Sequence, residues 1–193
     1  MALDWILASA SPRRRELLAR AGLHPTVIPA AIDETPRDDE GPVRYALRMA
    51  RDKALAVSAQ DARWVLAADT VVHLEGRVYG KPAHSDDARR MLRELSGCWH
   101  VVTSAFALAK SARVVQESSV STRVRFRPLG PGDIDRYVSG GEPLDKAGGY
   151  GIQGDGGALV DQVLGSYTCV VGLPLAEVLA ALRGHGIVEE ETT

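Results

Sequence analysis

The first residues that could do chemistry form an anion-binding pattern near the start of the chain. A strand-like stretch, LDWILA (3–8), leads directly into SASPRRRELL (9–18). The free backbone N–H groups at a helix N-terminus, together with the hydroxyls of Ser9 and Ser11, can bind phosphate oxygens. Arginine near a helix N-terminus is unfavourable while the site is empty, because the helix dipole is positive there, but its guanidinium matches the geometry of phosphate oxygens. We favour Arg13, the arginine nearest the turn, as the phosphate ligand. The alternative is a capped surface helix whose arginines are solvated.

A second candidate is the pair Asp69 and Thr70, which interrupts the apolar run WVLAADTVVHL (64–74). A charge in such a run is unfavourable unless it is paired or binds a metal. Asp69 is therefore a candidate to bind Mg²⁺ or to take a proton from water. The alternative is a carboxylate bound by local backbone groups. Asp33 and Glu34, in IDE, could add further metal-binding carboxylates, although IDE taken alone is typical of a solvated loop.

Two lysines and a glycine-rich loop complete the set. Lys53 in ARDKA and Lys81 in GKP matter only if they converge with Arg13, since most lysines lie on the surface. In the segment EPLDKAGGYGIQG the candidate ligand-binding side chains are Asp145, Lys146 and Gln153. Gln153 offers both a donor and an acceptor, which suits reading the edge of a base. The alternative is a loop that is merely flexible.

Several classes of function are disfavoured. The net charge of −2 over 193 residues argues against a general nucleic-acid binder. The five histidines show no paired metal spacing, and the two cysteines read as free thiols. The string GYGIQG satisfies GxGxxG, but no strand leads into it and no helix follows, so it is not a dinucleotide site. The N-terminus has neither a signal peptide nor a membrane span, which predicts a cytoplasmic protein without membrane contact.

The hydrophobic pattern predicts one α/β domain around a twisted mixed sheet flanked by helices. We expect this domain to cover residues 1–188, with a mobile acidic tail at 189–193. The expected strands are 3–8, 64–74, 100–109, 113–126 and 158–164, with 100–109 and 113–126 pairing in an antiparallel manner. The expected helices are 12–21, 42–59, 131–139, 173–184 and one that starts near Ser85 and stops at Gly97.

Eight segments together resemble the Maf family of nucleoside triphosphate pyrophosphatases. They occur in the order SASPRRRELL, IDE, ARDKA, AADTVV, GKP, MLRELSG, EPLDKAGGYGIQG and VVGLPL. The resemblance implies a two-lobed Maf/ITPase-like fold, a homodimer and a divalent cation, Mg²⁺ or Mn²⁺. It implies hydrolysis of a nucleoside triphosphate to the monophosphate and pyrophosphate. By the same resemblance Asp69 is the proton acceptor, Glu34 supports catalysis through the metal, and the phosphate-handling positions are Ser9, Arg13, Lys53 and Lys81.

The resemblance also separates two branches of the family. Arg13, Thr70 and Gln153 match the branch acting on dTTP and UTP, whereas the branch acting on 7-methyl-GTP carries Trp, Gln and Glu there. A small pyrimidine would fit a pocket closed by Thr70 and read by Gln153. Cys169 departs from the Asn or Ala usual in the family. A different class of function, a nucleotide sensor that regulates division without hydrolysis, is disfavoured by the intact set of Asp69, Lys53 and Lys81.

Overall fold

The computed structural model describes residues 3–189, which form two compact units. Within that range the first unit comprises residues 3–69, 104–120 and 172–189, and the second comprises 70–103 and 121–171. The hydrogen-bonded strand order is β2-β1-β3-β5-β6-β7, with β4 paired to β3. Parallel and antiparallel pairings both occur, so the predicted mixed α/β class is confirmed.

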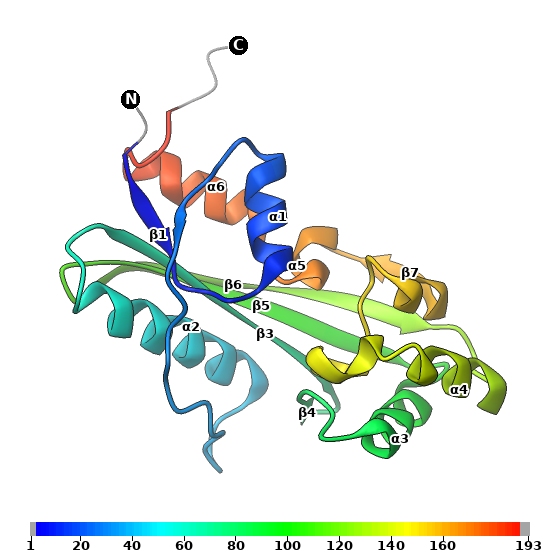
Figure 1. The fold of residues 1–193 in the computed structure, drawn as a ribbon. Helices are drawn as coiled ribbons and strands as arrows, with labels where there is room; N and C mark the ends of the chain where they lie inside the picture. The colour runs from blue at the N-terminus through cyan, green and yellow to red at the C-terminus, as the bar shows by residue number, and fades with distance from the viewer. Residues whose placement is uncertain (1–2, 190–193) are drawn as a thin grey trace. The chain divides into compact units, whose positions relative to one another are not determined.

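The first unit is built around β1 (Trp5–Leu7), which pairs in parallel with β2 (Thr26–Val27) and β3 (Trp64–Leu74). Helices α1 (Pro12–Arg20) and α6 (Leu175–Gly184) cover one face of these strands, and α2 (Pro42–Ser58) covers the other (Figure 1). Every β1 side chain is consequently buried, as expected for a parallel strand between two helical layers. Gly22, with φ of +74°, follows the end of α1, where a left-handed residue stops a helix.

The hairpin between β5 (Trp99–Lys110) and β6 (Arg113–Phe126) has a turn made by Ser111 and Ala112. Both residues are left-handed, with φ of 50° and 58°. This is the conformation of a type I′ turn, whose twist matches that of paired strands and which favours Asn-Gly. Neither residue present suits it, because a Cβ crowds the backbone at positive φ and neither side chain has the amide with which Asn compensates by local hydrogen bonds.

The double substitution Ser111→Asn and Ala112→Gly, which puts Asn-Gly in this turn, should raise the free energy of unfolding by about 1 kcal/mol. The substitution relieves strain at two positions, and the backbone bond from Ala112 N to Ser58 O (3.2 Å) does not depend on a side chain. Urea unfolding measures the effect. A midpoint that stays at the wild-type value would show that the turn stores no strain.

The second unit places helices α3 (Ser85–Leu95) and α4 (Pro131–Ser139) side by side (Figure 1). Three strands, β3, β5 and β6, contribute Val72, Val102 and Val124 to one buried cluster. Leu92 of α3 and Ile134 of α4 belong to the same cluster. The other elements of this unit are β4 (Arg77–Tyr79), β7 (Val160–Leu164), α5 (Tyr167–Val171) and three 3-10 helices, η1 (Glu142–Asp145), η2 (Ala147–Gly149) and η3 (Asp155–Leu159).

A buried histidine lies inside this cluster. His100 is 1% exposed, and its Nε2 lies 2.8 Å from the hydroxyl of Tyr150. Phe126 and Tyr150 meet the imidazole edge to face, at centroid distances of 4.9 and 5.4 Å. Burial in this apolar cage lowers the pKa of His100 to about 4.

His100 should make the protein less stable as the pH falls from about 6.5 to about 4. In that interval the unfolded chain binds a proton on this ring and the folded chain does not, so protonation favours unfolding. The full effect is about 3 kcal/mol. In His100→Gln, which does not titrate, chemical unfolding between pH 4 and 7 should show a shallower pH dependence. An unchanged slope would place the proton uptake on another group.

The predicted elements agree with the structure at several places and differ at others. The strands predicted at 64–74 and 113–126 and the helix at 131–139 have the observed bounds. The cap of α3 is His84, whose Nδ1 accepts from Asp87 N, instead of the predicted Ser85. The glycine-rich segment forms η1 to η3 where we expected only loop, and β4 and α5 were not predicted.

The predicted single domain at 1–188 stays a prediction, and residues 190–193 of the predicted tail lie outside the described part of the chain. Among residues 3–189, each helix is too short or too polar to span a bilayer.

Candidate functional site

The first unit brings three of the predicted site residues together around one ammonium group. Lys53 Nζ lies 2.7 Å from Asp69 Oδ1 and 2.8 Å from Glu34 Oε1. The Lys53 and Asp69 side chains are 11% and 12% exposed, whereas Glu34 is 53% exposed. The lysine therefore supplies the charge partner that a carboxylate in an apolar strand requires. It also directs two carboxylates from distant segments toward one point.

Asp69 lies inside β3 and does not end it. The strand continues through Asp69 and Thr70 to Leu74, and the residues just before Asp69, Ala67 and Ala68, are fully buried. A central strand, between β1 and β5, gives the carboxylate a rigid backbone. The sequence signal, a charge in an apolar run, is thus accounted for by an ion pair with α2.

Helix α2 also anchors the segment that carries Glu34. The Tyr45 hydroxyl donates to the Glu34 carbonyl (2.8 Å), and Arg48 Nη2 donates to the Thr35 carbonyl (3.0 Å). Arg48 is itself fixed by Glu40, with its Nε 2.7 Å from Glu40 Oε1. Tyr45 and Arg48 are three residues apart and so share a helix face with each other. Sequence reasoning did not identify either residue, because both act on backbone carbonyls.

Burial raises the pKa of Tyr45 to about 12, and the nearby carboxylates of Asp69 and Glu34 add to this. The Tyr45 hydroxyl therefore keeps its proton and remains a donor to Glu34. Asp33 caps the same segment, since its Oδ1 accepts from the Thr35 backbone N–H at 2.9 Å.

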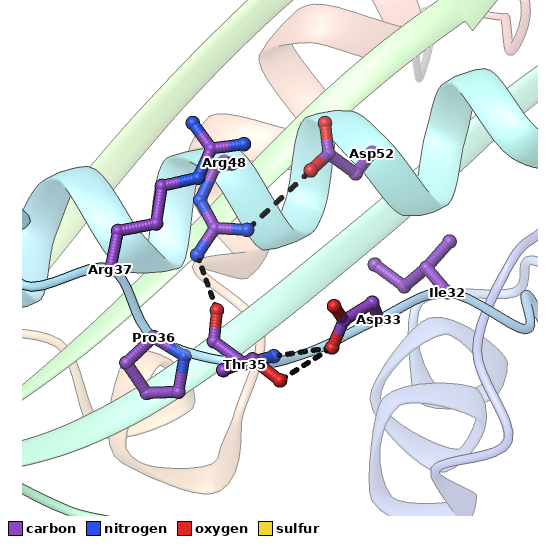
Figure 2. A pocket seen from close by; sticks show the side chains of 7 residues that line it. All are labelled: Ile32, Asp33, Thr35, Pro36, Arg37, Arg48 and Asp52. Carbon is purple, nitrogen blue, oxygen red and sulfur yellow. Dashed lines mark hydrogen bonds and ion pairs between the residues drawn. The ribbon is translucent and has the colours of Figure 1, made fainter.

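A pocket of about 520 Å³ lies beside this segment (Figure 2). Arg48 spans one side of it, between the Thr35 carbonyl and Asp52, whose carboxylate is 3.8 Å from Arg48 Nη1. The lining residues are Ile32, Asp33, Thr35, Pro36, Arg37, Arg48 and Asp52. Asp33, a candidate metal-binding carboxylate, lines the pocket, but Glu34, Lys53 and Asp69 do not, so we do not assign the substrate to it.

Arg14, and not only the predicted Arg13, belongs to the charged group. Arg14 Nη1 donates to Ser9 Oγ at 3.0 Å, and its Nε donates to the Gly172 carbonyl at 2.8 Å. Ser9 is buried after β1, and its Oγ also accepts from the backbone N–H of Ser11 at 3.2 Å. The turn from β1 into α1 is thereby tied to the segment that precedes α6.

The electrostatics around Arg14 link it to the carboxylates. Desolvation by burial lowers the pKa of Arg14, while the Asp69 carboxylate acts in the opposite direction. Arginine remains protonated in proteins, so a fixed positive charge lies near Asp69. Arg13 is half-buried in the first turn of the helix, and its charge adds to the same region. Ser11 is the N-cap residue of α1, but its side chain makes no capping hydrogen bond.

The other predicted site residues lie in the second unit. Lys81 is exposed and follows β4. The backbone N–H of Gly148 donates to the Gly80 carbonyl at 3.1 Å, so the turn carrying Lys81 contacts the glycine-rich segment. Thr70 is half-buried in β3, directly after Asp69.

Within the glycine-rich segment, Gln153 is exposed, whereas Lys146 is turned inward. Lys146 Nζ donates to the Glu142 carbonyl at 2.8 Å and to Asp145 Oδ1 at 2.6 Å. The side chain of Lys146 is only 14% exposed and that of Asp145 is 67% exposed. The contacts of Lys146 are thus structural ones, and its predicted role in substrate binding stays a prediction.

The expected metal must rely on few protein ligands. Residues 3–189 contain no group of three or more His, Cys, Asp or Glu side chains arranged to hold a metal ion. Asp69 and Glu34 nonetheless converge on one point, as their shared contact with Lys53 Nζ shows. One or two carboxylates together with substrate phosphates and water are a usual donor set for Mg²⁺. The residues present therefore fit a cation that arrives with the substrate.

Comparison with known proteins gives a consistent result. Residues 4–185 match the model of the family described as "Maf-like protein". The chain is 53% identical over 189 residues to a "dTTP/UTP pyrophosphatase" of Anaeromyxobacter dehalogenans, covering 96% of each. It is 50% identical over 183 residues to one of Myxococcus xanthus, covering 94% of this chain and 92% of the relative. A solved structure of a HAM1 protein from Coxiella burnetii shares the fold, with a TM-score of 0.55 and 18% identity, over 94% of this chain and 99% of that one.

Proposed function

The chain belongs to the Maf family, and on that premise we propose that it hydrolyses dTTP and UTP to the monophosphate and pyrophosphate. One observation carries the substrate assignment: relatives about half identical over nearly the whole chain are named for that reaction. The charged group of the first unit supports the chemistry. It combines three cationic side chains, Arg13, Arg14 and Lys53, with the carboxylates of Asp69 and Glu34.

In the proposed reaction Asp69 accepts the proton of the water that attacks the phosphorus, most simply the α-phosphorus. Until the substrate binds, Lys53 holds this carboxylate in position through the contact at 2.7 Å. Arg13, Lys53 and Lys81 bind phosphate oxygens and stabilise the negative charge that develops on the leaving pyrophosphate. Arg14 holds Ser9 in place, so that the hydroxyl and the N-terminus of α1 face the phosphates.

A divalent cation would be held by Asp69, Glu34 and substrate oxygens, and it would screen the charge of the triphosphate. Because Lys53 contacts both carboxylates, we propose that it moves toward the phosphates when the substrate binds. We propose that Thr70 and Gln153 contact the base. Gln153 pairs with the donor and acceptor edge of uracil or thymine, and the exposure of its side chain supports this role.

A panel of nucleoside triphosphates tests the proposal. With Mg²⁺ or Mn²⁺, the purified chain should convert dTTP and UTP to monophosphate and pyrophosphate in equal amounts, and faster than purine nucleotides. Release of orthophosphate instead of pyrophosphate would overturn the proposed bond cleavage. Binding of UTP without turnover would favour the nucleotide sensor, and preference for 7-methyl-GTP would place the chain in the other branch.

The proposal includes the homodimer that the family resemblance implies. Leu164 at the end of β7 and Tyr167 at the start of α5 are large apolar residues that are 54% and 49% exposed. Large exposed apolar side chains suit an interface between copies. Sedimentation equilibrium should give twice the chain mass, and a monomer at micromolar concentration would contradict the proposed dimer.

A further inference from the structure

A single carboxylate organises the segment that carries Gln153. Glu142 Oε2 accepts from the backbone N–H of Asp155 at 2.9 Å. Its Oε1 accepts from the Tyr137 hydroxyl at 3.0 Å and, at the longer distance of 3.5 Å, from the backbone N–H of Gly156. The two backbone donors belong to residues two and three positions after Gln153. Glu142 therefore binds one end of the short loop on which Gln153 is exposed.

Tyr137 of α4 binds the other end of the same loop. Its hydroxyl accepts from the backbone N–H of Gly151 at 3.1 Å while it donates to Glu142. Burial raises the pKa of Tyr137, so the hydroxyl remains protonated and can serve both partners. The hydrogen bonds of Tyr137 and Glu142 thus bracket the loop, from Gly151 before Gln153 to Asp155 and Gly156 after it.

The glycines of the loop are needed because the backbone lies directly against these side chains. A Cβ on Gly154 would lie 2.5 Å from Glu142 Oε2, and one on Gly156 would lie 2.7 Å from the Tyr137 hydroxyl. A Cβ on Gly151 would lie 2.6 Å from Lys146 Cε. No real Cβ tolerates such distances, so the glycines permit close approach. Three glycines of GYGIQGDGG, at 151, 154 and 156, thus let the backbone pass close to Lys146, Glu142 and Tyr137.

We propose that Glu142, together with Tyr137, is the positioning residue for base recognition, because it fixes the backbone that presents Gln153. This inference rests on the proposed function, in which Gln153 contacts the pyrimidine. Glu142 is suited to the task because both of its oxygens act as acceptors. In Glu142→Gln, an NH₂ group replaces Oε1 or Oε2 and therefore faces a hydrogen-bond donor. The remaining oxygen is neutral, so its hydrogen bond is no longer charge-assisted.

Glu142→Gln should weaken recognition of the base while leaving phosphate chemistry intact. We expect KM for UTP and the inhibition constant of UMP to rise about tenfold, which corresponds to one charge-assisted hydrogen bond. The kcat for UTP and the inhibition constant of pyrophosphate, which has no base, should stay within about twofold. Hydrogen exchange at the Asp155 and Gly156 amides should become faster. Glu94→Gln, a charge loss on α3 of the same unit, is the matched control.

Two further variants distinguish an error in the proposed base contact of Gln153 from an error in the positioning role of Glu142. Tyr137→Phe removes one oxygen from the same network, so it should raise the UMP inhibition constant even if Glu142→Gln does not fold. Gln153→Ala tests the premise directly. If Gln153→Ala leaves UMP inhibition unchanged, the proposed base contact is wrong, and the inference falls with it. If Gln153→Ala weakens UMP binding but Glu142→Gln and Tyr137→Phe do not, or if they weaken pyrophosphate binding equally, the positioning role is overturned.

Discussion

The variant Asp69→Asn should be folded, should bind nucleotide and should be almost inactive, with kcat for UTP lower by about 10²–10⁴-fold. An amide has the volume of the carboxylate but cannot accept the proton of the attacking water. Glu34 still lies 2.8 Å from Lys53 Nζ, so the lysine keeps one charged partner and the site is not left with an isolated cation. Steady-state kinetics with UTP measure the loss of turnover, and inhibition by UMP measures whether nucleotide binding is retained.

Asp52→Asn is a suitable control for this experiment. Asp52 precedes Lys53 on α2, but its carboxylate lies 3.8 Å from Arg48 Nη1. The control removes the same charge from the same region without touching the contact between Lys53 and Asp69, so its kcat should remain near that of the wild type. Substantial turnover by Asp69→Asn, at a thermal midpoint close to the wild-type value, would show that another group accepts the proton.

The pairing of Asp69 with a cation was the part of the site most open to prediction from the sequence. A carboxylate inside an apolar strand demands a partner, whatever the fold. The sequence singled out Lys53 and Glu34 as candidates, but a surface lysine and a solvated loop remained open interpretations until the family resemblance gave each a role. What it could not indicate is that one ammonium contacts both carboxylates. That geometry depends on how α2 packs against β3, which is a tertiary property.

The three consecutive arginines show a different limit. Successive helical residues point about 100° apart, so the sequence implies that they differ in role but not which one turns inward. Arg14 is the one that binds Ser9 and the Gly172 carbonyl, and Gly172 is 158 residues away along the chain. No local pattern encodes such a contact. The role of Arg13 as a phosphate ligand stays a prediction.

The glycine-rich segment was the least predictable element of the fold. Glycine clusters indicate turns, and we expected a loop. Glu142 and Tyr137 bind backbone groups up to 14 residues away, among them the Asp155 and Gly156 amides at the start of η3. Side-chain to backbone bonds of this kind leave no periodic trace in a sequence. The inward position of Lys146, which packs beneath Gly151, escaped prediction for the same reason.

Lys53→Met should lower kcat/KM for UTP by about 10²–10³-fold, because a cation that stabilises charge on the phosphates is lost. Methionine keeps much of the aliphatic stem but removes the ammonium from between Glu34 and Asp69. Lys110→Met is the control, since Lys110 Nζ lies over the Trp64 ring at 4.9 Å. The control should retain its activity.

The same variant makes a second readout possible that does not depend on turnover. Lys53 Nζ lies at the point on which both carboxylates converge, so it would compete there with a divalent cation. Removing the ammonium leaves two like charges close together, and a bound cation relieves their repulsion. Lys53→Met should therefore bind Mn²⁺ more tightly than the wild type in a calorimetric titration without nucleotide.

Adding Asp69→Asn to Lys53→Met should abolish this gain in Mn²⁺ affinity. If Lys53→Met bound Mn²⁺ no more tightly than the wild type, Lys53 would not be the occupant of the cation position, and the assignment of Asp69 and Glu34 as metal ligands would lose its structural basis.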